Sequence, residues 1–364
     1  MSDTGASPSQ TLQFACLCRK NWGHIKFPFP DTPRIGSLCH CYICRHITGS
    51  LCCSVISKST TPFTIEYEGT GPRGFLSMWA AYTAVVFCSH CGSTLLWQNE
   101  TEVLAIYTGV LRDPKGTVDF QNQCCALETG DGGLSVWLDL PKRTSCPIPR
   151  GLGSKEQEVM VLPREEPDTR ASCYCRNICF QITPPSVSST SPSSPFSDLI
   201  VPYHSGPSTN SADEKWWLRA NGTKYFAGTC ACQSCRLVSG NDIQTWAFVP
   251  KVNIRKFNGE PFDFSMAQLK RYESSKGVYR RFCSGCGATI FWHDETRPEL
   301  IDVAVGLLDA GSGARAEELL EWATEKVSFQ EDAQNKDLIA KLGRGIRAWA
   351  NSKAFVDLKT TLQQ

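Results

Sequence analysis

Short runs of β-branched and aromatic residues, separated by Gly and Pro, recur along the whole chain, and such runs predict strands. We expect strands at residues 54–56, 64–67, 83–87, 95–97, 103–107, 245–249 and 301–305. Helical spacing of apolar residues with few helix breakers occurs only near the C-terminus, where it predicts helices at 314–324 and 337–351. The pattern therefore predicts a mainly β protein with short helices near its C-terminus.

The sequence pattern repeats once along the chain. Three blocks recur in the same order: CHCYICRHITGS (39–50) with CACQSCRLVSGN (230–241), VFCSHCGSTLLW (86–97) with RFCSGCGATIFW (281–292), and VLAIYTGVLRD (103–113) with LIDVAVGLLDA (300–310). Repeated order of this kind indicates an internal duplication. The blocks pair Gly49 with Gly240, for which we expect a turn, and Gly109 with Gly306.

The duplication predicts two domains, at residues 11–150 and 171–355, after a disordered N-terminus at 1–10. The charged segment 151–170 contains Gly and Pro and predicts a linker. A Ser/Pro-rich stretch at about 183–213 is extra in the second copy. Ser and Pro cannot build a core, so this composition predicts a disordered or loop insertion.

Charge and composition exclude several partners. The 364 residues include 37 basic and 36 acidic side chains, and this balance does not favour binding to nucleic acid or to an anionic membrane. No signal peptide and no apolar stretch of about 18 residues is present. We therefore expect an intracellular, cytoplasmic protein without membrane contact, and a nuclear location stays open.

Twenty cysteines add chemistry to this picture. In an intracellular protein, CxC and CxxC clusters indicate metal ligands more than disulfides. Each copy contains a CxC, a CxCxxC and a CxxC, in that order. The CxC and CxxC pairs of one copy supply four thiolates, which suit a structural tetrahedral zinc ion. These predicted structural ligands are Cys16, Cys18, Cys88 and Cys91 in the first copy, and Cys173, Cys175, Cys283 and Cys286 in the second.

The CxCxxC segments leave three cysteines in each copy. Three protein ligands with an exchangeable fourth position are typical of catalytic zinc, which can bind a thiol or polarise a carbonyl group. Alternatively, a further cysteine closes the site: Cys52 or Cys53 in the first copy, and only Cys179 in the second. We expect up to two Zn²⁺ per domain and four per chain. The predicted catalytic ligands are Cys39, Cys41 and Cys44, and Cys230, Cys232 and Cys235.

Other polar residues flank these triplets. His40 and His46 occur beside the first triplet only, so an activity shared by both copies cannot use them, and we expect them to be exposed to solvent. Arg45 and Arg236 directly follow the triplets in both copies. Each could hold a substrate carboxylate in a bidentate fork, or offset the charge of the thiolates.

Together, CxC, CHCxxCR(x)3G and FCSxCG(S/A)T resemble the glutathione-dependent formaldehyde-activating enzyme family, which includes the centromere protein V branch. The resemblance covers most of both copies and identifies a tandem two-domain member. It implies two small zinc-binding β-tent domains, with structural zinc on the CxC and CxxC cysteines and catalytic zinc on the triplets. It also implies a carbon–sulfur lyase resembling S-hydroxymethylglutathione synthase, which interconverts that adduct with glutathione and formaldehyde.

The chain departs from the family in two places. Arg19 and Arg176 stand where the family usually has Gly after CxC, and segments 121–125 and 327–329 lack its His-Ile pair. These departures concern the use of glutathione more than the binding of zinc. The expected function is a zinc-dependent carbon–sulfur lyase whose partner is a small thiol–aldehyde adduct, with glutathione as one candidate thiol. The alternative is a non-enzymatic zinc scaffold for a protein or chromatin partner. A redox sensor using Cys52-Cys53 or Cys124-Cys125 is less favoured, because vicinal cysteines form strained bridges.

Overall fold

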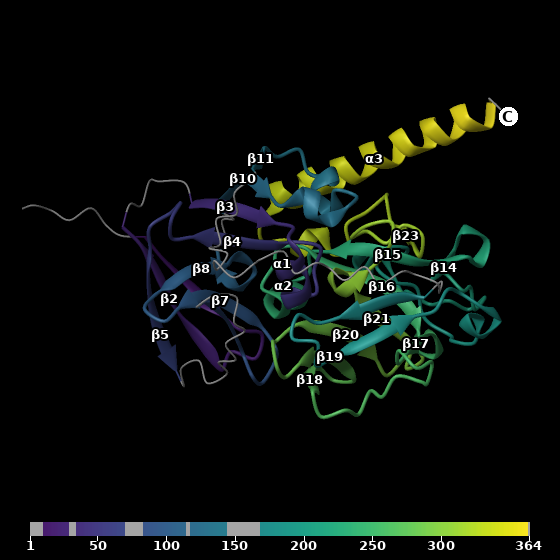
Figure 1. Ribbon diagram of the computed structural model, residues 1–364, viewed down its shortest axis with the longest axis horizontal. Coiled ribbons are helices and arrows are strands. Elements are labelled where there is room, and N and C mark those ends of the chain that lie inside the picture. Colours follow the sequence, from purple (N-terminus) through teal and green to yellow (C-terminus); the bar gives the residue numbers. More distant parts are fainter. Residues whose placement is uncertain (1–9, 29–33, 70–82, 114–116, 144–167, 363–364) are drawn as a thin grey trace, which may run out of the picture.

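The computed structural model describes residues 10–28, 34–69, 83–113, 117–143 and 168–362 (Figure 1). Within these ranges the chain consists mainly of strands, which form two cysteine-rich halves that follow one another in sequence. This confirms the predicted mainly β fold. The expected linker at 151–170 and the N-terminal segment 1–10 fall almost entirely outside the described ranges.

The first half contains two sheets. The smaller has the order β5-β2-β1-β9, and the larger has the order β11-β10-β3-β4-β8-β7-β6. Strand β10 runs parallel to β3 and β11, whereas the other neighbouring strands of these two sheets are antiparallel. The bounds are β1 (Gln10–Ala15), β2 (Asn21–Phe27), β3 (Arg34–Cys39), β4 (Cys53–Ser57), β5 (Thr64–Gly69), β6 (Thr83–Phe87), β7 (Thr94–Asn99), β8 (Val103–Tyr107), β9 (Leu111–Arg112), β10 (Val118–Cys124) and β11 (Lys142–Arg143).

The second half repeats this arrangement. Its smaller sheet has the order β17-β13-β12-β22, and its larger sheet has the order β14-β15-β16-β21-β20-β19-β18. Strand β23 pairs in parallel with β15, as β10 pairs with β3 in the first half. The bounds are β12 (Thr169–Ser172), β13 (Cys179–Ile182), β14 (Leu218–Arg219), β15 (Lys224–Cys230), β16 (Gln244–Pro250), β17 (Ile254–Arg255), β18 (Leu269–Ser275), β19 (Val278–Cys283), β20 (Thr289–Asp294), β21 (Leu300–Ala304), β22 (Leu308–Asp309) and β23 (Leu320–Trp322).

Each strand range predicted from the sequence lies within a strand of the structure, except for one residue. The exception is Val305, which begins the short 3₁₀ turn η8 (Val305–Leu307) instead of ending β21. Strands β4 and β16 are buried along their whole length, whereas β2 alternates between buried and partly exposed residues. A strand with both faces covered reads as a continuous apolar run, whereas a half-covered strand alternates. The sequence predicted β4 and β16 but not β2.

Three α-helices are present in the described chain: α1 (Tyr42–Thr48), α2 (Gln233–Ser239) and α3 (Lys336–Leu362). Helix α3 contains the predicted helix at 337–351, and confirms it. The predicted helix at 314–324 is wrong, because residues 320–322 form β23, in which Leu320 and Trp322 are buried and Glu321 between them is exposed. Alternation over so short a stretch was mistaken for helical spacing.

The Ser/Pro-rich insertion is an ordered loop with two 3₁₀ turns, η4 (Val187–Thr190) and η5 (Tyr203–Ser205). The indole nitrogen of Trp217 donates to the carbonyl of Ser189 at 3.0 Å. Leu199 packs against a small buried cluster that includes Trp216 and Phe248. The loop therefore has its own apolar anchors, which a count of Ser and Pro residues did not reveal.

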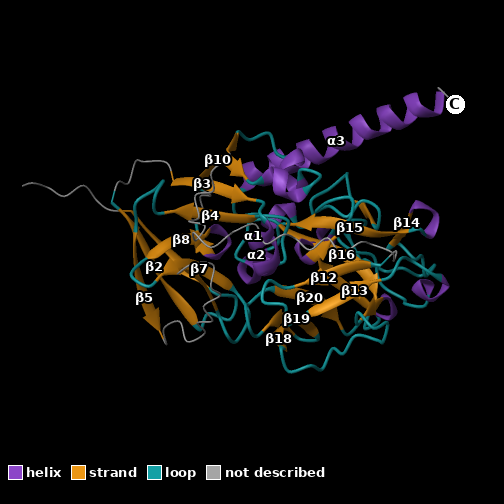
Figure 2. Cartoon of the chain, viewed as in Figure 1, coloured by secondary structure: helices purple, strands orange, loops and turns teal. Residues whose placement is uncertain are grey.

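The two halves pack closely around α1 and α2, which lie between the two groups of strands (Figure 2). Helix α1 ends at Gly49 and α2 at Gly240, both left-handed with φ of 76°, so the predicted turns are confirmed. The amide of Gly306 donates to the carbonyl of Gly49 at 3.0 Å, and the amide of Gly109 donates to that of Gly240 at 2.8 Å. The same contact occurs twice with the halves exchanged, which indicates an approximate two-fold axis. The largest buried cluster draws residues from both halves.

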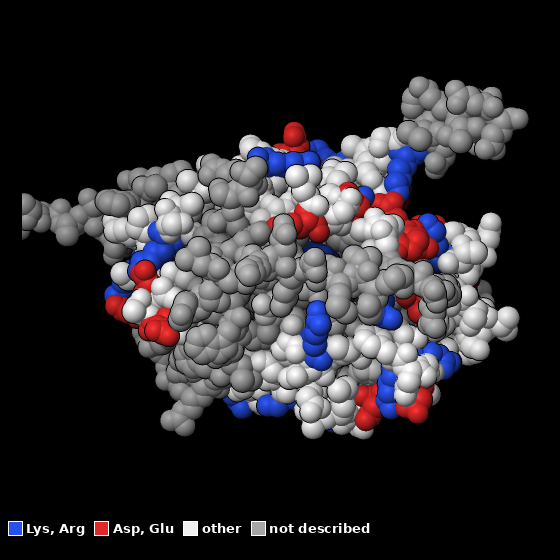
Figure 3. Space-filling model, in the orientation of Figure 1, with Lys and Arg blue, Asp and Glu red and all other residues white. Residues whose placement is uncertain are grey.

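On the face shown in Figure 3, basic and acidic side chains are interspersed. Among the described residues, no helix combines the length and the apolar character needed to cross a membrane.

Candidate metal centres

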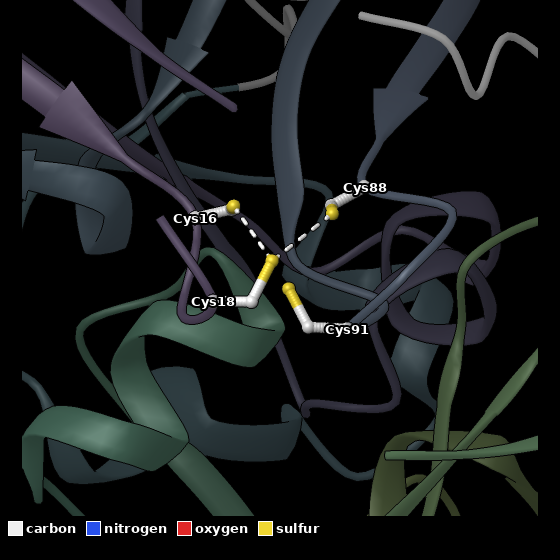
Figure 4. Close-up of side chains that lie close together, drawn as sticks. All are labelled: Cys16, Cys18, Cys88 and Cys91. Atoms are coloured by element: carbon white, nitrogen blue, oxygen red, sulfur yellow. Dashed lines mark hydrogen bonds between the residues drawn. The ribbon is translucent and has the colours of Figure 1, made fainter. Parts of the chain in front are cut away.

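Four cysteines from two loops meet in the first half (Figure 4). Cys16 and Cys18 follow β1, and Cys88 and Cys91 follow β6. The Sγ of Cys18 lies 3.4 Å from that of Cys16 and 3.6 Å from that of Cys88. Hydrogen bonds with the thiol of Cys16, and then of Cys18 and Cys91, lower the pKa of Cys88, which favours the thiolate that metals bind.

The backbone also supports this first four-cysteine cluster. The amide of Arg19 donates to the carbonyl of Cys16 at 3.0 Å, and the amide of Gly92 donates to that of Cys88 at 2.8 Å, closing two tight turns. The side-chain amide of Asn21 donates to the Sγ of Cys88 at 3.0 Å. Donors aimed at sulfur offset the negative charge of a thiolate.

The second half contains the equivalent cluster of Cys173, Cys175, Cys283 and Cys286. The Sγ of Cys175 lies 3.5 Å from that of Cys173 and 3.4 Å from that of Cys283. Ligands bound to zinc at 2.3 Å in a tetrahedron are separated by about 3.8 Å, so both clusters are close to the required spacing. Among the described residues, none of the motif cysteines forms a disulfide. Both four-cysteine clusters therefore fit a tetrahedral zinc ion.

The CxCxxC segments fold in the same way in both halves. Each crosses from the end of a strand into a short helix, α1 or α2, whose N-cap is Cys41 or Cys232. The N-cap Sγ accepts the amide of Cys44 in the first half and of Cys235 in the second, each at 3.4 Å. The helix turn thus brings the sulfurs of one CxCxxC segment together. The sequence did not predict either helix, because seven residues are too few to show helical spacing.

In the first half the close trio is Cys39, Cys44 and Cys53, whose Sγ atoms all lie within 4.8 Å of one another. Cys53 begins β4 and stands opposite Cys39 in the antiparallel register of β3 and β4. Cys41 is not one of this trio. Its pKa is lowered mainly by hydrogen bonds with the thiols of Cys39 and Cys44, which places it beside the same two residues. Four thiols therefore gather here.

Two further cysteines approach the first-half site. Cys124 ends β10 and pairs with Cys39 in the parallel register, and the Sγ of Cys125 lies 3.9 Å from that of Cys39. The sequence presented these two only as a vicinal pair. Cys125 lies 86 positions from Cys39 along the chain, and this distance concealed the place of the vicinal pair beside the metal-ligating motif.

In the second half Cys230, Cys232 and Cys235 lie within 4.8 Å of one another, as the sequence predicts for a metal site. Cys232 is partly exposed and the other two are buried. Arg280, on β19, donates from Nη2 to the Oγ of Ser234 at 2.7 Å and to the Sγ of Cys235 at 3.4 Å. Arg280 precedes the FC motif by two residues and was not among the residues that the sequence motifs singled out.

A buried carboxyl group lies on β21, which β20 separates from β19 in the same sheet. Asp302, on β21, accepts from the Nη2 of Arg297 at 2.8 Å. Burial raises the pKa of Asp302 to about 6, and the Arg297 guanidinium opposes that rise. The carboxylate of Asp302 is thus paired with the guanidinium of Arg297.

The arginines that follow the triplets contact the partner half. Arg236 donates from Nη1 to the carbonyls of Gly109 and Leu111, the latter at 3.1 Å. Arg45 is 5 % exposed, and burial lowers its pKa while the charge of Asp309 opposes this. Arg236 therefore fastens α2 to the first half. A role in holding substrate stays a prediction.

The expectation that His40 and His46 are exposed is wrong, because both have 0 % exposure. The Nε2 of His40 lies 3.2 Å from the Oε1 of Gln123, and the Nδ1 of His46 lies 2.8 Å from the carbonyl oxygen of Ser172. Burial lowers the pKa of His40 to about 4. The packing of α1 against the second half covers His46, and this contact is not visible in the sequence.

These observations define a class of protein: a tandem pair of β domains, each with two cysteine clusters that could bind metal. The profile of the family described as glutathione-dependent formaldehyde-activating enzyme matches the chain twice, at residues 11–124 and 217–324, so the chain belongs to this family. The second match begins after Cys173 and Cys175, yet the structure brings both to Cys283 and Cys286.

One solved structure is also similar in sequence. It is the crystal structure of a Rhodobacter sphaeroides protein, 17 % identical over 42 % of this chain and 98 % of that chain, with a TM-score of 0.24. A TM-score that low carries no information about the fold or the function of this chain. No curated protein matches the chain.

Proposed function

We propose that this protein is a zinc-dependent carbon–sulfur lyase that acts on a thiol–aldehyde adduct such as S-hydroxymethylglutathione. Family membership supports the reaction class. The observation that carries the proposal is the second-half triplet, in which three thiols lie within 4.8 Å and one of them is partly exposed. Three close ligands with an accessible side are what an exchangeable fourth position requires.

The residues of the chain suggest how the reaction proceeds. Cys230, Cys232 and Cys235 would hold the zinc ion, which when bound supplies a Lewis acid that favours the thiolate form of a substrate sulfur. In the cleavage direction the carbon–sulfur bond breaks and its electron pair stays on sulfur, while the hydroxyl group gives its proton to solvent water as the aldehyde forms. The guanidinium of Arg280, which lies beside Cys235, would stabilise the negative charge on the substrate sulfur. The buried surroundings keep that charge interaction strong.

The test is the exchange between glutathione, formaldehyde and their adduct, followed by NMR with the purified full chain. We expect the zinc-loaded protein to accelerate this exchange and the Cys232→Ser variant to return it to the uncatalysed rate. Cys179→Ser is the matched control, because Cys179 is also partly exposed and belongs to none of the metal-binding groups of the described residues. A folded, zinc-loaded protein without any acceleration would contradict the proposal and favour the zinc scaffold.

A further inference from the structure

The two CxCxxC sites share a backbone but differ in the side chains around it. Strand register gives the correspondence: Cys39 stands opposite Cys53, and Cys230 stands opposite Gln244. Trp97 and Trp292 are equivalent tryptophans of the two halves. On the neighbouring strand, Val85 stands opposite Trp97 and Arg280 stands opposite Trp292. A thiol and an apolar side chain of the first half are therefore replaced by an amide and a cation in the second.

Cys53 supplies the first site with a fourth thiol. The Sγ atoms of Cys39, Cys44 and Cys53 all lie within 4.8 Å of one another, so Cys53 lies beside two thiols of the CxCxxC segment. Cys41 is 5 % exposed, and Cys39 and Cys53 have 0 % exposure. Four thiolates fill the tetrahedral sites of zinc and leave no position for a substrate.

Gln244 cannot complete the second site in the same manner. Its Oε1 accepts from the amide of Thr245 at 2.9 Å, and its buried Nε2 has no hydrogen-bond partner within the described part of the chain. A carboxamide is a far weaker zinc ligand than a thiolate. Cys232 stays partly exposed, unlike Cys41, so the second site also keeps an approach from solvent.

Arg280 adds a positive charge to the second site, and only one of its three nitrogens has a hydrogen-bond partner among the described residues. It is 2 % exposed, and its Nε and Nη1 have no hydrogen-bond partner among the described residues. Leaving two buried donors without partners costs free energy unless a ligand accepts from them. The nearby Asp302 is hydrogen-bonded to Arg297, so among the described residues the Nε and Nη1 of Arg280 are left without an acceptor. An anionic group, such as a carboxylate, fits this requirement.

The Ser/Pro-rich insertion, which only the second half possesses, packs against β15. A Cβ on Gly228 of β15 would lie 2.3 Å from Leu199 of the insertion, so the loop rests directly on the strand that leads to Cys230. Asp198 accepts from the backbone amide of Phe329 at 2.9 Å and from the Oγ of Ser328 at 3.1 Å. Ser328 in turn forms an isolated bridge with Cys230.

From these differences we infer that the CxCxxC sites of the two halves have different roles. The first site is a closed four-thiolate metal centre completed by Cys53. The second site alone has an exchangeable position, where Arg280 binds an acidic group of the thiol substrate. This inference rests on the proposed function and names the half and the substrate class that serve it.

Metal exchange tests the division without measuring turnover. The zinc-loaded full chain is mixed with a chromophoric chelator, and the rapidly and slowly released zinc ions are counted. We expect one rapidly released ion per chain and three slowly released ones. Gln244→Cys should abolish the rapid phase by copying the first site, and Cys53→Gln should add a second rapid phase. Two rapid ions in the unaltered protein, or a rapid phase that survives in Gln244→Cys, would overturn the inference.

The outcomes separate this inference from the proposed function. One rapidly released zinc ion without any acceleration of adduct exchange would contradict the lyase and leave the division of the halves intact. Acceleration together with two rapid ions would support the lyase and contradict the division. Gln244→Cys decides alone if Cys53→Gln does not fold.

Ligand binding to the cobalt-substituted full chain tests Arg280. Absorption bands of the cobalt ion respond when a thiol binds, which gives an affinity for glutathione and for 2-mercaptoethanol, which has no carboxylate. We expect Arg280→Val, which copies Val85, to weaken glutathione binding by about 10- to 100-fold, the usual range for a lost charge-assisted hydrogen bond. Binding of 2-mercaptoethanol should change little. An equal effect on both thiols, or none on either, would show that Arg280 does not bind an acidic group.

Discussion

Two arginines occupy backbone positions that are better suited to glycine. Arg19 has a φ of 61° and Arg176 a φ of 59°, both in the left-handed region. Each follows a CxC pair, and its backbone amide closes the turn by donating a hydrogen bond to the carbonyl of the first cysteine, at 3.0 Å for Arg19 and 2.9 Å for Arg176. A Cβ in this region clashes with the backbone, which glycine avoids. Glycine would occupy this position without strain.

Replacing Arg176 by Gly should therefore stabilise the protein. The side chain of Arg176 is exposed, so little contact is lost. Relief of the left-handed strain, less the added freedom of the unfolded chain, gives a gain of about 1 kcal/mol in the free energy of unfolding. Urea unfolding of the zinc-loaded protein measures this. Arg176→Ala is the control, because alanine keeps the Cβ and should give no gain.

The sequence predicted which cysteines of each four-cysteine cluster meet, but only part of the triplet sites. CxC and CxxC spacings are short enough for local turns to fix the geometry, so Cys16, Cys18, Cys88 and Cys91 could be grouped before any fold was known. The place of Cys53 depends on the strand register opposite Cys39, and spacing along the chain does not contain that information. For the same reason Arg280 was not identified.

At the scale of elements, α3 shows how packing overrides helix propensity. Two glycines, Gly343 and Gly345, lie within this helix, although glycine disfavours helix by about 1 kcal/mol relative to alanine. A Cβ on Gly345 would lie 1.7 Å from the carbonyl oxygen of Trp137. The ring of Trp137 packs edge-on against Trp349 of the same helix, with centroids 5.5 Å apart. Gly345 is therefore required for the approach of α3 to the first half.

Alanine at these two positions should have opposite effects. A Cβ on Gly343 would lie 3.6 Å from its nearest neighbour, so Gly343→Ala should gain up to about 1 kcal/mol from helix propensity alone. Gly345→Ala should lose about 1–3 kcal/mol, because the backbone of η3 (Gly133–Trp137) must move away. Urea unfolding followed by tryptophan fluorescence compares the pair. Equal gains would show that α3 does not need this close approach.

At the scale of the whole molecule, the halves interlock at their four-cysteine clusters. A Cβ on Gly92, next to Cys91, would lie 2.5 Å from the ring of Phe282 in the second half. A Cβ on Gly287, next to Cys286, would lie 2.4 Å from the ring of Phe87 in the first half. Each metal-binding loop thus rests on the aromatic residue that precedes the other loop. The sequence revealed the duplication, but it did not indicate that the copies share one core, since contacts between copies leave no periodic pattern.

This interlocking predicts that loss of one cluster loosens both halves. Cys283→Ser removes one ligand of the second four-cysteine cluster, next to Phe282, against which Gly92 of the first half packs. We expect amide hydrogen exchange to become faster around Gly92 as well as around Gly287, because the two loops share one packed surface. Cys179→Ser, which leaves all clusters intact, should change neither region. If Cys283→Ser left exchange near Gly92 unchanged, the halves would be stable independently of each other. Their reciprocal contacts would then serve only to hold them together.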